Sequence, residues 1–151
     1  MFSKVFNLPD EKSTIDLGRK LAHMAKTRDT FALYGTLGMG KSVLSRAFIQ
    51  ELTAVKEVPS PTFTLVQSYD APDFTIYHFD LYRLKNADEI FEIGVEEALY
   101  SGVSLIEWPE RMQPYLPRDI FQINIEPDGA GRKLTITTTS LEKQQRLEQL
   151  K

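Results

Sequence analysis

The sequence predicts an α/β fold in which helices flank a mixed, partly parallel sheet and antiparallel hairpins extend that sheet. Two observations carry this prediction. Apolar runs typical of buried strands alternate with helical periodicity over the first two thirds of the chain, and parallel strands need such crossover helices. Pairs of alternating segments joined by short turns occur in the middle and near the C-terminus, which predicts hairpins. At 151 residues, the chain is expected to form a single domain over residues 1–151.

The N-terminal part is expected to form two strand–helix pairs. Pro9 ends a segment that alternates in polarity, and Asp10 or Ser13 follows as a helix cap. An apolar stripe at helical spacing comes next, and then "TFALYG", a short apolar run that ends in glycine and predicts a buried strand. The expected elements are a strand at 3–8, a helix within 8–26, a strand at 30–35 and a helix at about 41–54.

The C-terminal part is expected to contain two hairpins, a buried strand and two helical segments. The turn "APD" separates two alternating segments, and a Gly-rich turn separates two more near the end. Gly94 is a candidate break within the first helical segment, and Pro109 follows the buried strand. The expected elements are strands at 64–70 and 74–80, a helix at 86–102, a strand at 103–107, a hairpin within 119–139 and a polar helix at 140–151.

Composition limits the possible functions. A net charge of −3 argues against bulk electrostatic binding to nucleic acid, although a protein partner could itself hold RNA. The chain has no cysteine, which excludes disulfides, thiolate metal sites and a cysteine nucleophile. Residues 1–12 lack the apolar core of a signal peptide, and the longest unbroken apolar run, 31–34, is too short to span a bilayer. We therefore expect a cytoplasmic protein that has no membrane partner.

The stretch "LYGTLGMGKSVLSRAF", residues 33–48, has the form Gly-x-x-x-x-Gly-Lys-Ser of a phosphate-binding P-loop. Gly35 and Gly40 begin and end the spacing, and the expected strand and helix flank it. Backbone N–H groups in such a turn, together with the positive end of the next helix, hold a di- or triphosphate. Lys41 would reach the β- and γ-phosphates, and the hydroxyl of Ser42 would bind Mg²⁺. The sequence therefore predicts a P-loop NTPase sandwich.

Two carboxylates stand at the ends of expected strands. Asp80 ends "FTIYHFD", and Glu107 ends the apolar run "VSLIE". A carboxylate at the end of a buried strand is costly unless a cation or donor partners it. Alone, Asp80 could be a turn residue or pair with Arg83, and Glu107 could cap a helix before Pro109. Beside a P-loop, both are expected to organise magnesium.

The segment "PSPTFTL", residues 59–65, follows the P-loop helix, where many NTPases keep a switch that senses the γ-phosphate. Thr62 and Thr64 would share one face if the segment is extended. An ordinary Pro-rich loop is the equal alternative. Trp108 could belong to the core or cover the nucleotide. His78 shares a strand face with Asp80, but two histidines without a ligand cluster make a poor metal site.

Four segments in this order and spacing, "YGTLGMGKS", "SPTFTLV", "YHFDLYRL" and "LIEWPER", closely resemble the bacterial TsaE (YjeE) family. The likeness covers nearly the whole chain, including "LPDEKSTIDLG" at the start. It implies the small ATPase of the machinery that makes threonylcarbamoyladenosine at position 37 of tRNAs that read ANN codons. Such a protein would bind ATP and Mg²⁺ and join the pair TsaB and TsaD. TsaD would transfer the threonylcarbamoyl group, and tRNA would be reached only through the complex.

The resemblance also implies roles for individual residues. Lys41, Asp80 and Glu107 would be catalytic, and Ser42, Asp80 and Glu107 would hold magnesium, directly or through water. Where the family usually has Asp, Ala and Thr, this chain has Thr36, Met39 and Ser42, so its nucleotide affinity could differ. The residues expected around the nucleotide are Asp10, Thr14, Gly35, Leu37, Gly38, Met39, Gly40, Lys41, Ser42, Val43, Thr62, Thr64, Trp108 and Arg132.

Two other functions use the same motif. A small-molecule kinase would transfer phosphate to a metabolite, but no paired-arginine lid is visible in the sequence. A non-hydrolytic module would bind nucleotide and change partners, and the two carboxylates argue against it. ATP turnover with and without candidate acceptors separates these functions.

Overall fold

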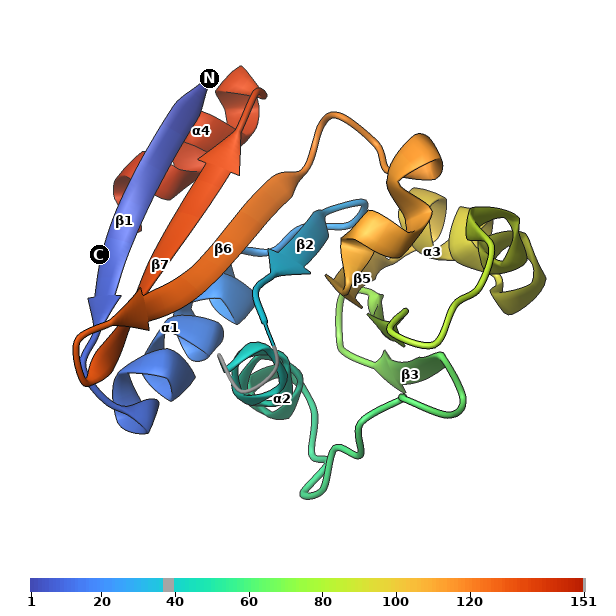
Figure 1. The fold of residues 1–151 in the computed structure, drawn as a ribbon, viewed down its shortest axis with the longest axis horizontal. Coiled ribbons are helices and arrows are strands. Elements are labelled where there is room, and N and C mark those ends of the chain that lie inside the picture. The colour runs from blue at the N-terminus through green and yellow to red at the C-terminus, as the bar shows by residue number, and fades with distance from the viewer. Residues whose placement is uncertain (37–39, 151) are drawn as a thin grey trace.

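The computed structural model describes residues 1–36 and 40–150 (Figure 1). Strands and helices alternate from the N-terminus to β3, and the β3–β4 hairpin follows, as the hydrophobic patterns predict. The elements are β1 (Phe2–Leu8), α1 (Glu11–Met24), β2 (Thr30–Tyr34), α2 (Lys41–Leu52), β3 (Val66–Asp70), β4 (Thr75–Asp80), the 3₁₀ helix η1 (Ala87–Ile93), α3 (Val95–Ser101), β5 (Val103–Glu107), the 3₁₀ helix η2 (Pro109–Tyr115), β6 (Phe121–Asp128), β7 (Gly131–Thr138) and α4 (Leu141–Gln149).

The strands form one seven-stranded sheet in the order β1-β7-β6-β2-β5-β4-β3. The four central strands, β6, β2, β5 and β4, pair in parallel, whereas β3 pairs antiparallel with β4 at one edge. At the other edge, β7 and β1 continue the sheet in antiparallel pairing. The predicted fold class, a mixed and partly parallel sheet with added hairpins, is confirmed.

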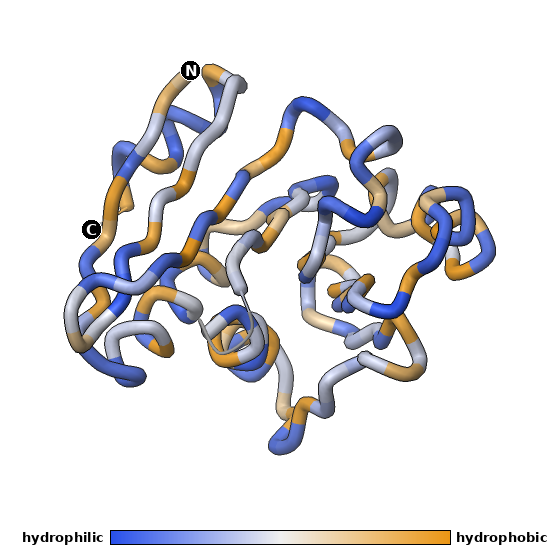
Figure 2. The backbone as a smooth tube through the Cα atoms, viewed as in Figure 1, coloured by the Kyte–Doolittle hydropathy of each residue, from blue (hydrophilic) through white to orange (hydrophobic). Residues whose placement is uncertain are grey.

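Alternation along the strands distributes apolar side chains to both faces of the sheet, and Figure 2 shows hydrophobic and hydrophilic residues alternating along β6. One core cluster joins Leu33 and Leu105 to Phe48 of α2 and to α1 and α4. A second cluster joins Phe79 and Ile106 to η1, α3 and η2. The side chains of β4 that point the same way as Ile76, a member of the first cluster, therefore face α2.

Helix α1 lies directly against α2 because Gly18 has no side chain. A Cβ at Gly18 would come within 2.8 Å of the carbonyl oxygen of Leu44 and 2.9 Å of the Cβ of Ala47. Asp10, the N-cap, accepts a hydrogen bond from the Ser13 backbone N–H at 2.9 Å, and Ser13 Oγ accepts one from the Asp10 N–H. This close packing fixes the start of α2 next to the start of α1.

Some boundaries differ from the sequence-based expectation. Gly94 does break the expected helix at 86–102, because it adopts a left-handed φ of +81° and ends η1 before α3 begins. The strand expected at 64–70 starts only at Val66. Residues 62–64 form a turn instead, and Leu65 has a φ of +68°. No helix in the described ranges has the length and apolarity needed to cross a membrane.

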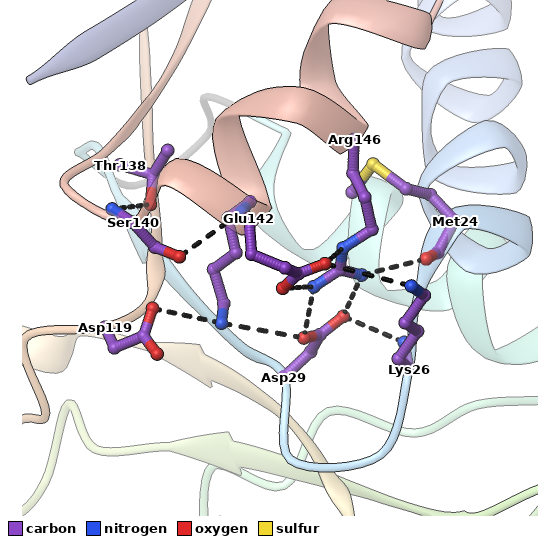
Figure 3. Close-up of polar contacts among 9 residues, drawn as sticks. Met24, Lys26, Asp29, Asp119, Thr138, Ser140, Glu142 and Arg146 are labelled. Atoms are coloured by element: carbon purple, nitrogen blue, oxygen red, sulfur yellow. Dashed lines mark hydrogen bonds and ion pairs between the residues drawn. The ribbon is translucent and has the colours of Figure 1, made fainter.

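Charged groups fasten α4 to the loop before β2 (Figure 3). Asp29 is buried, and Arg146 of α4 donates to both of its carboxylate oxygens at 2.7 Å. The same guanidinium donates to the Met24 carbonyl at 3.0 Å, and the Lys26 backbone N–H donates to Asp29 at 2.8 Å. Glu142 also pairs with Arg146 at 2.7 Å, and the Lys143 ammonium lies 3.9 Å from Asp29, so several charges and two backbone groups share one polar network.

Replacing Asp29 by alanine should lower the free energy of unfolding by about 3 kcal/mol, because it leaves the Arg146 guanidinium without its buried counter-charge. Urea unfolding followed by circular dichroism measures the change. Asp16→Ala is the matched control, since Asp16 is exposed and lies 4.0 Å from the exposed Arg19, and it should change stability by less than about 0.5 kcal/mol. Equal losses in both variants would contradict this role of the network.

Candidate functional site

Three parallel strands end side by side at one edge of the sheet. Glu107, the last residue of β5, pairs with Leu33 of β2 on one side and with Asp80, the last residue of β4, on the other. The chain leaves β2 at this edge and returns as α2, which begins at Lys41. Parallel α/β sheets place ligand sites outside the carboxyl ends of their strands, and here that edge holds two carboxylates and a helix N-terminus.

A cavity of about 430 Å³ lies at this edge. Its described lining comes from the β1–α1 junction, the start of α2, the segment before β3, the ends of β4 and β5, and the β6–β7 turn. The lining residues are Leu8, Pro9, Asp10, Glu11, Thr14, Gly40, Lys41, Ser42, Val43, Ser60, Thr62, Asp80, Glu107, Trp108, Ala130, Gly131 and Arg132.

The start of α2 faces the cavity with its backbone donors uncapped by an N-cap side chain, because the N-cap residue is Gly40. Gly40 has a φ of +100°, in the region that favours glycine. No acidic residue occupies the first turn of α2. The first N–H groups of a helix lack partners within the helix, and together with the helix dipole they attract anions.

The Lys41 ammonium lies against the wall of the cavity. The residue is 4% exposed, and its Nζ donates to the Gly35 carbonyl at 2.6 Å. Nζ also lies 3.7 Å from the centre of the Trp108 ring. Burial lowers the pKa of Lys41, while the nearby Glu107 and other carboxylates act in the opposite direction. A phosphate bound beside Lys41 would be stabilised by this partly desolvated cation.

Trp108 has an unusual backbone for a bulky residue. Its φ of +60° lies in the left-handed region, where side chains other than glycine, asparagine and aspartate are uncommon. The indole ring lies 4.9 Å from the ring of Tyr82. This conformation turns the chain sharply after β5 and brings the ring over Lys41.

The Glu107 carboxylate is anchored at both oxygens. Ser42, in the first turn of α2, donates from Oγ to Oε1 at 3.1 Å. His78, on β4, contacts Oε2 through Nε2 at 2.6 Å. Glu107 is 3% exposed, and His78 is 2% exposed. Glu107 therefore connects α2 to the sheet. The alternative that it caps the next helix is wrong, because Trp108 is the N-cap of η2.

The Asp80 carboxylate is anchored by the segment before β3. Thr62 Oγ1 donates to Oδ2 at 3.0 Å, and Ser60 Oγ lies 3.4 Å from the same oxygen. The Tyr82 backbone N–H donates to Oδ1 at 3.0 Å, so Asp80 also stabilises a turn, as the simpler interpretation expected.

The alternative in which Asp80 pairs with Arg83 is not found among the described contacts. The Arg83 guanidinium lies instead over the ring of Phe63, 4.5 Å from its centre. Phe63 is 82% exposed at the tip of the turn that carries Thr62. Within this turn, Thr62 contacts Asp80, and the next residue, Phe63, exposes its aromatic ring.

Ser42, Asp80 and Glu107 place a hydroxyl and two carboxylates close together in the lining of the cavity. The described residues contain no cluster of three or more His, Cys, Asp or Glu side chains suited to a metal. Mg²⁺ does not need such a cluster, because it is usually bound by one or two carboxylates together with substrate phosphates and water. The donor set therefore fits Mg²⁺ that accompanies a phosphate ligand.

The model of the family "Threonylcarbamoyl adenosine biosynthesis protein TsaE" matches residues 8–134. The tRNA threonylcarbamoyladenosine biosynthesis protein TsaE of Rickettsia conorii is 41% identical over 140 residues, which cover 91% of this chain and 80% of that protein. Its namesake from Haemophilus influenzae is 36% identical over 135 residues, with 85% of each chain covered.

This chain belongs to the TsaE family. The crystal structure of Bacillus subtilis YdiB supports the fold, with a TM-score of 0.80 and 26% identity, covering 99% of this chain and 94% of that one. The resemblance predicted from the four motifs is confirmed. The family match ends at residue 134, so it includes Asp29 but not α4, which carries Arg146.

Most residues that the resemblance implicates in this TsaE-family chain meet in the cavity. Gly35 is not a lining residue, and its carbonyl contacts Lys41. Thr64 is not brought there either: its hydroxyl accepts a hydrogen bond from Gln67 at 3.1 Å. The residues brought together are Asp10, Thr14, Gly40, Lys41, Ser42, Val43, Thr62, Asp80, Glu107, Trp108 and Arg132. Leu37, Gly38 and Met39, also expected there, lie outside the described residues.

Sequence reasoning missed His78, which it set aside because it found no metal-ligand cluster. The period-2 pattern did place His78 on the face of Asp80, and this was the available signal. The β6–β7 turn was expected near the nucleotide only through Arg132. The turn approaches the β1–α1 junction because Gly131 is small: a Cβ there would lie 2.6 Å from the Leu8 carbonyl oxygen.

Proposed function

We propose that this TsaE-family chain binds ATP with Mg²⁺ and hydrolyses it in tRNA threonylcarbamoyladenosine biosynthesis, in support of repeated turnover by a TsaB–TsaD pair. The observation that carries the proposal is the cavity in which Lys41 and Ser42, at the start of α2, meet Asp80 and Glu107. Its volume of about 430 Å³ is within the range of small-ligand sites. A role in tRNA modification would place the protein in the cytoplasm and tRNA within reach through the complex.

In this proposal, the start of α2 binds the phosphates. The uncapped N–H groups after Gly40 would donate to phosphate oxygens, and the Lys41 ammonium would neutralise their charge. The buried position of Lys41 supports this role, because a cation removed from water interacts more strongly with an anion. Asp10, Thr14 and Arg132, which also line the cavity, would contact the nucleotide.

Ser42, Asp80 and Glu107 would hold Mg²⁺, directly or through water. The metal would supply charge neutralisation to the phosphates that react. Glu107 accepts a hydrogen bond from Ser42 of α2 and is fixed at both oxygens, so it is suited to orient the attacking water. A change in the ligands of Asp80 would reach the segment before β3, because Thr62 and Ser60 of that segment bind one of the Asp80 oxygens.

The turn that carries Thr62 is the proposed reader of the nucleotide state. Thr62 contacts Asp80 from inside, while Phe63 is largely exposed on the outside. A change in the ligands of Asp80 would alter the Thr62 contact and with it the position of an aromatic ring available to a partner. Aromatic residues and arginine are frequent energetic anchors at protein interfaces, and Arg83 lies against Phe63.

Thr62→Ala should weaken the coupling between nucleotide and partner without unfolding the chain, because it removes the hydroxyl that binds Asp80. Calorimetric titration of the TsaB–TsaD pair into the protein should show tighter binding with ATP and Mg²⁺ than with ADP or no nucleotide, and the variant should reduce that difference. Thr139→Ala, which alters an exposed threonine whose hydroxyl contacts the Arg118 carbonyl, serves as the control.

ATP hydrolysis, measured with the same proteins, tests the proposed function. Addition of TsaB and TsaD should raise ATP hydrolysis by the wild-type chain. Equal partner affinity in all three nucleotide states would contradict the switch, because a ligand that does not discriminate between states cannot shift them. Phosphate transfer to an added metabolite rather than to water would instead indicate a kinase, and binding without turnover a non-hydrolytic module.

A further inference from the structure

His78 is one of the most deeply buried polar residues of the chain, and packing alone does not account for it. Its side chain is 2% exposed and lies on β4 between Ile76 and Asp80, on the same face of the sheet. Its Nε2 contacts Glu107, but Nδ1 is buried without a hydrogen-bond partner among the described residues. A buried polar atom without a partner costs free energy, which an apolar side chain at this position would avoid.

The register of the sheet explains why His78 can reach Glu107. Glu107 pairs with Asp80 across the parallel β4–β5 ladder, and His78 stands two residues before Asp80, opposite Leu105. The imidazole therefore crosses diagonally to Glu107 and meets Oε2 at 2.6 Å. With a carboxylate at that distance, Nε2 carries the hydrogen and donates it.

We propose that His78 is a positioning residue, which holds the Glu107 carboxylate in the orientation that Mg²⁺ and the attacking water require. Ser42 already engages Oε1, so a carboxylate held only there could rotate about that contact. The His78 donor at Oε2 fixes the second oxygen and thus the plane of the group. In other proteins, loss of a group that hydrogen-bonds to a metal ligand typically costs roughly 10–100-fold in metal affinity or activity.

This inference rests on the proposed function, since it concerns the Mg²⁺ that would accompany ATP. It adds a residue that touches neither ATP nor metal in the proposal and acts through Glu107. The neighbouring groups on this face support the assignment, because Asp80 is held by Thr62, Ser60 and the Tyr82 N–H and needs no contact from His78.

His78→Gln and His78→Met form the test pair. Their side chains are similar in length, but only glutamine offers an N–H at about the position of Nε2. For each protein, the affinity for a non-hydrolysable ATP analogue is measured by calorimetry with and without Mg²⁺, together with kcat and KM for ATP. Addition of Mg²⁺ should raise the affinity of the Met variant for the analogue about tenfold less than it raises that of the wild type. The kcat of the Met variant should fall about tenfold or more. Its affinity without Mg²⁺ should stay unchanged, and the Gln variant should recover most of the loss.

A double-mutant cycle shows whether His78 acts through Glu107. In a Glu107→Gln background, His78→Met should add little further loss, because the carboxylate that it positions is gone. His23→Met is the matched control: His23 is the other histidine of the chain, and it contacts Glu51 at the surface. This control should match the wild type in every measurement.

The outcomes separate the inference from the proposed function. If the wild-type chain bound the analogue equally with and without Mg²⁺ and did not hydrolyse ATP, the proposed function would be wrong. If the wild type showed both properties and the Met and Gln variants behaved alike, the positioning role of His78 would be overturned. Loss of the circular dichroism spectrum in both variants would assign His78 to the core and overturn it equally.

Discussion

Replacing Lys41 by alanine should lower the affinity for ATP by roughly 100-fold or more and abolish measurable hydrolysis, because it removes a desolvated cation that would neutralise phosphate charge. The fold should persist, since the Lys41 ammonium contacts only the Gly35 carbonyl and the face of Trp108 among the described groups. Calorimetry with a non-hydrolysable ATP analogue measures the affinity, and circular dichroism checks the fold.

Lys56→Ala is the matched control for this substitution, because Lys56 is exposed between α2 and β3 and away from the cavity. It should bind the analogue as the wild type does. A folded Lys41→Ala protein that hydrolyses ATP at the wild-type rate would overturn the assignment of residues 35–42 as a phosphate-binding loop.

Replacing Glu107 or Asp80 by alanine should reduce turnover by about 10² or more, a typical loss when electrostatic support of a transition state is removed. Nucleotide binding should fall much less, because the start of α2 and Lys41 remain. Steady-state rates and calorimetric affinities separate the two effects. Glu107→Ala also removes the partner of Ser42 and His78, so its stability should be measured in parallel.

Glu126→Ala is the control for the two carboxylates, because Glu126 is an exposed residue of β6. Its turnover should equal that of the wild type. Wild-type turnover in both Asp80→Ala and Glu107→Ala would leave these residues as structural groups, with Asp80 as a turn residue. A parallel loss of binding and turnover would instead indicate that they shape the cavity rather than support the reaction.

Local sequence patterns were sufficient to predict much of the fold and the centre of the site. The glycine spacing followed by Lys41 and Ser42 predicted where α2 begins, and the apolar run ending at Glu107 predicted a buried strand with a carboxylate at its end. Period-2 alternation placed His78 and Asp80 on one face of β4. These features depend on neighbours within a few residues, so they can be read without the fold.

Other features depend on how distant segments pair, and no local pattern encodes them. The contact between His78 and Glu107 requires the parallel register of β4 and β5, which joins segments 29 residues apart. The separation of Thr62 from Thr64 arises from a turn with Leu65 at positive φ, where an extended strand was expected. The position of Trp108 over Lys41 likewise follows from a left-handed backbone that the sequence does not reveal.

The central claim is that the cavity between α2 and the ends of β4 and β5 binds ATP with Mg²⁺. The most direct test is calorimetric titration of a non-hydrolysable ATP analogue with Mg²⁺ into the wild-type chain and into Lys41→Ala. We expect saturable binding at one analogue per chain in the wild type and a loss of affinity of roughly 100-fold or more in the variant. No saturable binding by the wild type, or equal affinity in both proteins, would contradict it.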